Sequence, residues 1–514
     1  MKKQNPILME IIIAAAGGLV LGALLSLFGP GAFLPGWLKT SLLAALLLFA
    51  LMRIARGLAA DKRLVLLMAV TFLVRIAVGA FLYQALPQQE SDNPVQQAGY
   101  VFADAHERDQ AAFQMASSHN PWLEELKGYK AADQYGGFLT LSALIYRIFS
   151  MDVHRPLLIV LVTAFAMAAG LACLYSAISR KWNLKLAAIA GWIFALYPDG
   201  ILLGASQMRE PVLITLTCLL LYTSLAWKEK PLRTLILGLL ITLLTCLFSV
   251  PGGCAALAVV AGLVFFDWMN GQVNPKIRTA GYIVFTGFVV LAVLAGWFWL
   301  KETLAYEYYL TESLSGVVQV ILDRYGSQYR IPLITFYGLT QPLLPAALVD
   351  PSTPLSQAIS IFRAFGWYFL IPFVIYGFFA VFKSEKKEHR SMLIFLSLAI
   401  AAWVFISSLR GGGDQWDNPR YRATFLPWMA LLAGWVWLRL GEKKRPWFWR
   451  IVAVEAVFVL VLLNWYLNRY YDIGTKISDP MMILLMGGLS LLIIAVGVVV
   501  DIKNRRKKSP AADR

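Results

Sequence analysis

The stretch FADAHERD, residues 102–109, concentrates side chains that can carry out acid–base chemistry, among them Asp104, Arg108 and Asp109. In a helix, Asp104 and Arg108 lie four residues apart and can form an ion pair, whereas Asp109 points to a different face. A carboxylate that is partly withdrawn from water becomes more basic and can accept a proton from a substrate hydroxyl. Asp104 and Asp109 are therefore candidate general bases. The alternative is a solvated helix with one weak surface ion pair.

A second group of charges surrounds a helix break in LYPDGILLGASQMREP, residues 196–211. Pro198 ends one apolar run with Asp199 beside it, and Arg209 and Glu210 open the next run. A helix N-terminus that carries an arginine favours an anion such as a phosphate. We therefore expect a binding site at this turn. The alternative is an Arg209–Glu210 ion pair that anchors the helix end among lipid headgroups.

A third group lies in RGGGDQWDNPRYR, residues 410–422. Its glycines allow a ligand to approach the backbone closely, and Arg420 and Arg422 carry planar guanidinium groups that match a phosphate. We expect both arginines to contact substrate. Contact with lipid headgroups is the alternative.

Long apolar runs must position these three stretches. The chain is 59% hydrophobic and 15% charged, and runs of about 20 apolar residues recur along it. Such runs predict an all-α polytopic membrane protein, because helices satisfy their own backbone hydrogen bonds in lipid. We expect about 14 transmembrane helices, at 7–27, 37–57, 63–86, 155–178, 184–198, 205–227, 232–250, 253–269, 279–300, 362–383, 391–409, 423–440, 450–468 and 481–501.

The charge distribution predicts the orientation. The net charge is +16, but the basic residues cluster in short segments between apolar runs, which does not indicate nucleic-acid binding. With the N-terminus inside, more than half of the 46 lysines and arginines fall in cytoplasmic segments, and most of the 30 acids fall outside. Both termini should therefore be cytoplasmic, in a plasma membrane that we expect to be bacterial.

Two predicted outer segments are long, 87–154 and 301–361, and segments of this length are usually functional or separately folded. Within the first, FLTLSALIYRIFS at 138–150 is amphipathic and too short to span, which suits a helix at the membrane interface. All three charged stretches fall on the outer side. They predict one outward-facing cavity with carboxylates and arginines above a hydrophobic groove, which would suit a lipid-linked phosphate.

The order of these features resembles the GT-C superfamily of membrane glycosyltransferases. Its family-39 members include protein O-mannosyltransferases and the lipid A aminoarabinose transferase. These enzymes typically carry an Asp early in the first large outer loop, followed at helical spacing by an aromatic or polar residue and an alanine. Asp104, Arg108 and Ala112 are similar to that pattern, with Arg108 in place of the usual tyrosine. The usual Asp-Glu pair is missing because Ala105 follows Asp104, which leaves Asp109 as the alternative catalytic acid.

The resemblance extends to other segments. DQYGGFLTLSALIYRIFS, residues 133–150, is similar to the juxtamembrane stretch of the family, and this resemblance implies that Asp133 and Tyr135 bind substrate. The second acid of the family corresponds here to Glu210 or Asp199. We assign Glu210 to catalysis, and Asp199 and Arg209 to substrate binding.

The resemblance also implies a division of the chain. Two extra N-terminal helices (1–62) precede a GT-C-like core (63–300). The second outer segment (301–361) follows, and then C-terminal helices with a basic cytoplasmic tail (362–514).

The activity that the resemblance implies is inverting transfer of a sugar from a polyprenyl-phosphate donor to an acceptor (protein, lipid or polysaccharide) at the outer face. Some GT-C members use a divalent metal bound by Asp-x-Asp. This chain has no Asp-x-Asp, so we expect neither a metal nor another cofactor. Two alternatives stay open: a polysaccharide polymerase or ligase that uses a lipid-pyrophosphate saccharide, and a transporter of lipid-linked saccharide.

Overall fold

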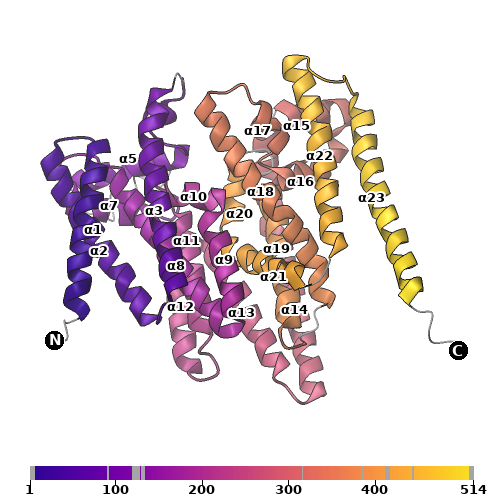
Figure 1. The fold of residues 1–514 in the computed structure, drawn as a ribbon, viewed down its shortest axis with the longest axis horizontal. Coiled ribbons are helices and arrows are strands. Elements are labelled where there is room, and N and C mark those ends of the chain that lie inside the picture. Colours follow the sequence, from indigo (N-terminus) through magenta and orange to yellow (C-terminus); the bar gives the residue numbers. More distant parts are fainter. Residues whose placement is uncertain are drawn as a thin grey trace.

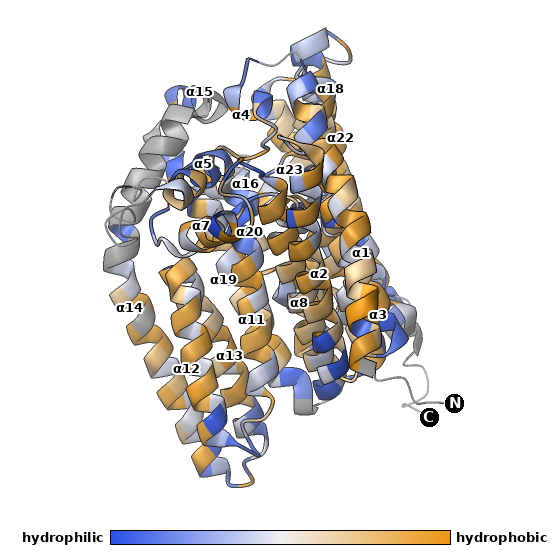
Figure 2. Cartoon of the chain, turned by 90° about the vertical axis from the view of Figure 1, so that its left-hand side faces the viewer, coloured by the Kyte–Doolittle hydropathy of each residue, from blue (hydrophilic) through white to orange (hydrophobic). Residues whose placement is uncertain are grey.

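The computed structural model describes residues 6–89, 92–118, 128, 133–314, 316–383, 387–410, 417–442 and 445–508. The protein is all-helical, with 85% helix and no strand in these ranges. Within these ranges, eleven helices are long and apolar enough to cross a membrane. Figure 2 shows hydrophobic residues along these helices and hydrophilic residues gathered towards their two ends. The predicted fold class, an all-α polytopic membrane protein, is confirmed at this level.

Each of the 14 predicted spans coincides with a helix. These helices are α1 (Pro6–Phe28), α2 (Phe33–Gly57), α3 (Lys62–Ala85), α8 (Leu157–Lys181), α9 (Leu184–Leu196), α11 (Glu210–Ser224), α12 (Pro231–Phe248), α13 (Val250–Asn270), α14 (Pro275–Leu314), α18 (Pro354–Ala380), α19 (Lys387–Arg410), α21 (Leu426–Glu442), α22 (Pro446–Tyr471) and α23 (Asp479–Lys508).

Three of these helices are shorter than predicted. Helices α9, α11 and α21 have 13, 15 and 17 residues. At about 1.5 Å per residue they fall short of a hydrocarbon core of about 30 Å. Helices α11 and α21 are largely buried, and in α21 Trp428 through Ala433 are fully buried; α9 is buried on one side only. The apolar runs predicted their positions but not their lengths.

Burial separates central from peripheral helices. In the most apolar window of α8, 89% of residues are buried, against 0% in α14 and 6% in α23. Figure 1 places α8 within the bundle and α23 along one edge, with α1 and α2 at the other edge. The apolar stretch of α23 is nevertheless the most hydrophobic of the candidate spans. Its apolar surface therefore suits contact with lipid rather than with protein.

A sharp bend interrupts the chain where α9 meets α10 (Pro198–Gly204), and the two helices make an angle of 61°. Pro198 begins α10, as the sequence predicts, since proline is favoured in a first helical turn. The carbonyl groups freed at the bend are bound by Arg75 of α3, which is fully buried. Its guanidinium donates to the carbonyl oxygens of Phe194 (3.5 Å) and Ala195 (3.1 Å) at the end of α9, and also to that of Gly200 within α10 (3.2 Å).

The segments predicted to share a side of the membrane contact one another. Arg56 at the end of α2 pairs with Glu10 at the start of α1 (2.6 Å), and Lys228 before α12 pairs with Asp267 near the end of α13 (3.0 Å). The start of α1 and the end of α23 lie at the same end of the bundle in Figure 1. The predicted grouping of segments is consistent with these contacts. Which end is cytoplasmic stays a prediction.

The two predicted outer segments are largely helical. The first contains η1 (Leu86–Gln88), α4 (Pro94–Gln97), α5 (Ala103–Ser117) and α7 (Gly137–Phe149). The second contains the end of α14, then α15 (Gly316–Tyr325), η2 (Ser327–Tyr329), α16 (Arg330–Thr340) and α17 (Leu344–Val349). The predicted boundary at residue 300 falls inside α14. Helix α18 ends in η3 (Val381–Lys383), and α20 (Asp417–Ala423) lies between α19 and α21.

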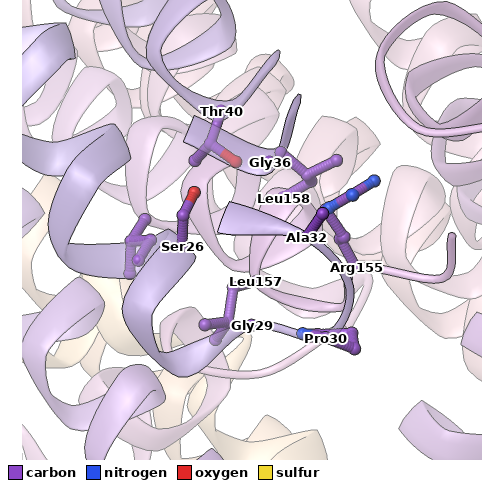
Figure 3. Close-up of a pocket in the computed structure, with 10 residues that line it drawn as sticks. Ser26, Gly29, Pro30, Ala32, Gly36, Thr40, Arg155, Leu157 and Leu158 are labelled. Carbon is purple, nitrogen blue, oxygen red and sulfur yellow. The ribbon is translucent and has the colours of Figure 1, made fainter. Parts of the chain in front are cut away.

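A small cavity of about 10 Å³ lies between the α1–α2 pair and the start of α8. Figure 3 shows the side chains of Ser26, Thr40 and Arg155 around it. This volume holds about one water molecule. The Ser26 hydroxyl and the Nε of Arg155 are buried without a hydrogen-bond partner, so a water molecule here would link the first two helices to the bundle.

Candidate functional site

Helix α5 carries Asp104 and Arg108 on one face, as predicted from the FADAHERD stretch. Asp104 lies in the first turn, where the helix dipole stabilises a negative charge. Its side chain is 47% exposed, whereas that of Arg108 is only 4% exposed. The two do not form the predicted ion pair: Asp104 pairs with Arg420, and Arg108 with Asp133. Each residue therefore pairs with a residue from another part of the fold and not with its neighbour on α5.

Asp133 is held by the first turn of α7. It accepts hydrogen bonds from the backbone N–H of Tyr135 (3.3 Å) and of Leu139 (3.0 Å). Gly136, which precedes the helix, has φ +76°, a conformation that glycine adopts without strain. This turn places the buried carboxylate of Asp133 between two guanidinium groups, at 3.9 Å from Nε of Arg108 and 3.5 Å from Nη1 of Arg209.

Arg209 and Glu210 begin α11, as the sequence predicts. They do not pair with each other as in the headgroup-anchor alternative. Arg209 pairs with Asp133, and its guanidinium lies 5.2 Å from the ring centre of Tyr135. Glu210 is buried, and its Oε1 lies 3.4 Å from Nε of Arg420. Arg209 and Tyr135, both predicted to bind substrate, are therefore in contact.

Helix α20 brings Arg420 to the same place. The side-chain amide of Asn418 in α20 donates a hydrogen bond to the carbonyl oxygen of Gly338 in α16 (2.7 Å). The indole N–H of Trp403 in α19 donates to the carbonyl oxygen of Tyr421 in α20 (3.0 Å). These two bonds fix α20 against α16 and α19. Arg420 Nη1 then donates to Oδ2 of Asp104 at 2.7 Å. The helix thus carries Arg420 to α5 and α11, which lie far from it in the sequence.

These contacts define an acid–arginine cluster from four elements. Its members are Asp104, Arg108, Asp133, Arg209, Glu210 and Arg420. Three carboxylates balance three guanidinium groups, and five of the six side chains are at most 16% exposed. A buried group of this kind is costly unless every charge is paired and hydrogen-bonded.

Arg108 and Glu210 of the cluster have buried polar atoms without a hydrogen-bond partner. Nη1 of Arg108 is a buried donor with no acceptor, and Oε2 of Glu210 is a buried acceptor with no donor. Leaving each of these groups unmet costs roughly 1–3 kcal/mol. A ligand that offers an acceptor and a donor together, such as a phosphate oxygen and a sugar hydroxyl, would satisfy both.

The electrostatics of Asp104 differ from the sequence-based expectation. Burial raises the pKa of Asp104, as expected, but Arg420, Arg108 and Arg209 outweigh burial and hold that pKa below its ordinary value. The predicted increase in basicity is therefore wrong for this state of the protein, because the sequence did not show the arginines around the acid. With Arg420 turned to a ligand, the same carboxylate would lose its strongest partner and become more basic.

Asp109 lies on the other face of α5, as predicted, and is fully buried. It accepts hydrogen bonds from the hydroxyl groups of Tyr100 (2.7 Å) and Tyr146 (2.6 Å), and its Oδ2 lies 2.9 Å from Nε2 of His154. Burial, followed by the charge of Asp109, raises the pKa of both tyrosines, so both stay protonated donors. Asp109 thus joins α5 to α7 and to the residues before α8.

Asp199 and Arg422 belong to a second cluster. Asp199 forms a buried ion pair with Nε of Arg363 at 2.7 Å, and both side chains are 2% exposed. Arg422 is fully buried, lies 3.5 Å from the ring centre of Trp367 and donates to the carbonyl oxygen of Gln341 at 2.7 Å. Their predicted roles in substrate binding stay predictions.

Other predictions concern a metal and a cavity. Among the described residues, no group of three or more His, Cys, Asp and Glu side chains could hold a metal ion. Residues 411–416, the glycine-rich part of the third stretch, lie outside the described residues. The two cavities described in the structure lie away from the acid–arginine cluster, so the predicted outward-facing cavity stays a prediction.

Comparison with known proteins assigns no family: no family model matches the sequence, and no curated protein matches it.

Sequence reasoning missed four residues that the geometry brings forward. Arg108 appeared as an ion-pair partner of Asp104 and not as a binding residue. Arg363 and Arg75 lie inside predicted spans, where a charged residue is itself a signal of function or of a buried partner. His154 carried no signal, because its contact with Asp109 joins residues 45 positions apart.

Proposed function

We propose that the protein is a membrane glycosyltransferase of the GT-C type, which moves a sugar from a polyprenyl-phosphate donor to an acceptor at the outer face of the membrane. The observation that carries this proposal is the pair of unmet atoms in the acid–arginine cluster, Nη1 of Arg108 and Oε2 of Glu210. A glycosyl phosphate supplies the acceptor that Arg108 lacks and the hydroxyl donor that Glu210 lacks.

The chemistry assigns one role to each kind of residue. Asp104, the most exposed carboxylate of the cluster, takes the proton from the acceptor hydroxyl. The acceptor oxygen then forms a bond to the anomeric carbon as the bond from that carbon to the phosphate oxygen breaks. The leaving polyprenyl phosphate carries the negative charge, which Arg108, Arg209 and Arg420 stabilise.

The cluster also supports a division between binding and catalysis. Arg209 lies over Tyr135, and Asp133 holds the Arg108 and Arg209 guanidinium groups in place from beneath. Glu210 orients Arg420 and offers its free oxygen to a sugar hydroxyl. Under this proposal six of the nine residues predicted from the sequence act together, with Asp109 as a positioning residue for α5. The six are Asp104, Asp133, Tyr135, Arg209, Glu210 and Arg420.

The decisive experiment incubates the purified full-length protein, reconstituted in lipid, with labelled polyprenyl-phosphate sugars and measures donor turnover. We expect turnover by the natural protein and a loss of at least about 100-fold in Asp104→Asn, the usual range for a general base. Glu107→Gln is the matched control, since Glu107 is exposed on the same helix. Its turnover should be unchanged.

Two outcomes would replace the proposal. Vectorial movement of intact lipid-linked saccharide without any turnover would indicate the transporter. Turnover of lipid-pyrophosphate oligosaccharides, with polyprenyl-phosphate monosaccharides inert, would indicate the polymerase or ligase. Both outcomes are read from the same labelled donors.

A further inference from the structure

A pocket of about 380 Å³ opens where α15, α22 and α23 meet, on the side of the molecule opposite the chain termini. It is lined by the end of α15, the last turns of α22 and the residues that lead into α23. No residue of the acid–arginine cluster lines it. Figure 1 shows α5 and the α22–α23 pair towards opposite sides of the molecule, so this pocket is separate from the candidate active site.

The lining of the pocket is positively charged. It includes three cations, Arg324, Arg469 and Lys476, and one acid, Asp479. Arg324 is bonded to Asp479. Among the described residues, neither Arg469 nor Lys476 has a carboxylate within ion-pair distance. The Arg469 guanidinium lies 5.1 Å from the ring centre of Trp465, which holds it at the pocket wall. The pocket therefore retains two uncompensated positive charges.

The surroundings of the pocket are apolar on one side. The first turns of α23 below it expose Met481 (51%), Ile483 (62%) and Leu484 (66%). Side chains of this kind on a helix of such high hydropathy face lipid tails. This end of the bundle is the one that the sequence predicts to face outward, where cations run against the usual distribution of charge in membrane proteins. A ligand with an anionic head and apolar tails accounts for both features.

We propose that this pocket binds the phosphate of an anionic membrane phospholipid such as phosphatidylglycerol, whose acyl chains lie along α23. Arg469 and Lys476 contact the phosphate, and Arg324 with Asp479 closes the pocket towards α15. The bound lipid joins three segments that are far apart in the chain. This assignment is independent of the proposed glycosyltransferase activity, because it uses different residues and a different ligand.

The test uses full-length protein in nanodiscs of phosphatidylcholine that contain a small fraction of phosphatidylglycerol. After transfer to detergent, native mass spectrometry counts the phosphatidylglycerol that stays bound. The affinity of the variant Arg469→Gln with Lys476→Gln for this lipid should fall about 25-fold, since each cation near a membrane surface contributes about fivefold. The charge-keeping variant Arg469→Lys with Lys476→Arg should retain it as the natural protein does.

A matched control removes two exposed cations at the opposite end, Lys230→Gln with Arg233→Gln, and should retain the lipid fully. The proposal is overturned if the variant Arg469→Gln with Lys476→Gln retains as much phosphatidylglycerol as the natural protein. A second arm adds free glycerol phosphate to protein in phosphatidylcholine alone and follows thermal unfolding. We expect no stabilisation. The lipid assignment is overturned in favour of a soluble phosphate if glycerol phosphate stabilises the natural protein but not the glutamine variant, and the natural protein retains no phosphatidylglycerol.

Discussion

Arg420 donates a 2.7 Å hydrogen bond to Asp104, a residue 316 positions earlier in the chain. The same guanidinium lies 3.4 Å from Glu210, so one side chain of the C-terminal half joins two acids of the N-terminal half. The acid–arginine cluster is therefore assembled only when both halves are folded together. Neither half can be expected to contain a complete site.

The pH dependence of turnover should respond to Arg420. Because Arg420, together with Arg108 and Arg209, overcomes burial and lowers the pKa of Asp104, the carboxylate stays ionised to a lower pH than usual. In Arg420→Gln the pKa of Asp104 rises, so the acidic limb of kcat/KM moves to higher pH. Arg420→Lys should move it less. If Arg420→Gln lowers kcat/KM equally at every pH and the acidic limb stays at the same pH, Asp104 is not the titrating base.

Asp109→Asn should destabilise the protein more than it slows turnover. The change weakens the hydrogen bonds from Tyr100 and Tyr146 and the contact with His154. We expect a loss of about 2–4 kcal/mol, measured as the free energy of unfolding in detergent. Turnover per folded molecule should stay within about tenfold. Tyr146→Phe, which removes one donor, should cost about 1 kcal/mol. Normal stability with abolished turnover would make Asp109 the base.

Arg108→Gln should weaken donor binding without unfolding the protein. Arg108 pairs with Asp133 only at 3.9 Å and its Nη1 has no hydrogen-bond partner, while Asp133 keeps Arg209 at 3.5 Å and two backbone donors when Arg108 is replaced. The KM for the donor should rise about 10- to 100-fold, the value of a hydrogen bond between charged groups. Product inhibition by polyprenyl phosphate should weaken in parallel. Unchanged donor affinity together with a large loss of stability would assign Arg108 to packing.

The Asp199–Arg363 pair should behave as a structural unit. Both side chains are 2% exposed, so Asp199→Asn breaks a buried ion pair and should cost about 3–5 kcal/mol in unfolding free energy. The double change Asp199→Leu with Arg363→Met should recover most of that loss. If Asp199→Asn instead keeps full stability and raises the KM for the donor, Asp199 binds substrate as the sequence predicted.

The sequence predicted elements better than partners. Apolar runs located every long helix, and the spacing of Asp104 and Asp109 correctly placed them on different faces of α5. The break at Pro198 and the start of α11 at Glu210 were also predicted. Each of these features is set by residues within a few positions of one another.

Ion pairs between distant elements could not be predicted in this way. The local rule paired Asp104 with Arg108, but α20 and the turn before α7 supply the stronger partners. Arg420 and Arg422 looked equivalent in RGGGDQWDNPRYR, yet two positions on a helix are about 200° apart, so they enter different clusters. Nothing in the local sequence indicated that this stretch contains a helix.

The α9–α10 bend constrains how the chain can enter the membrane. The carbonyl groups of Phe194 and Ala195, freed at the bend, are bound by Arg75, which belongs to α3 and is synthesised more than a hundred residues earlier. A segment inserted alone would expose those carbonyls to hydrocarbon, where each unmet group costs several kcal/mol. The broken helix therefore needs α3 already in place to receive it, and the order of synthesis supplies α3 first.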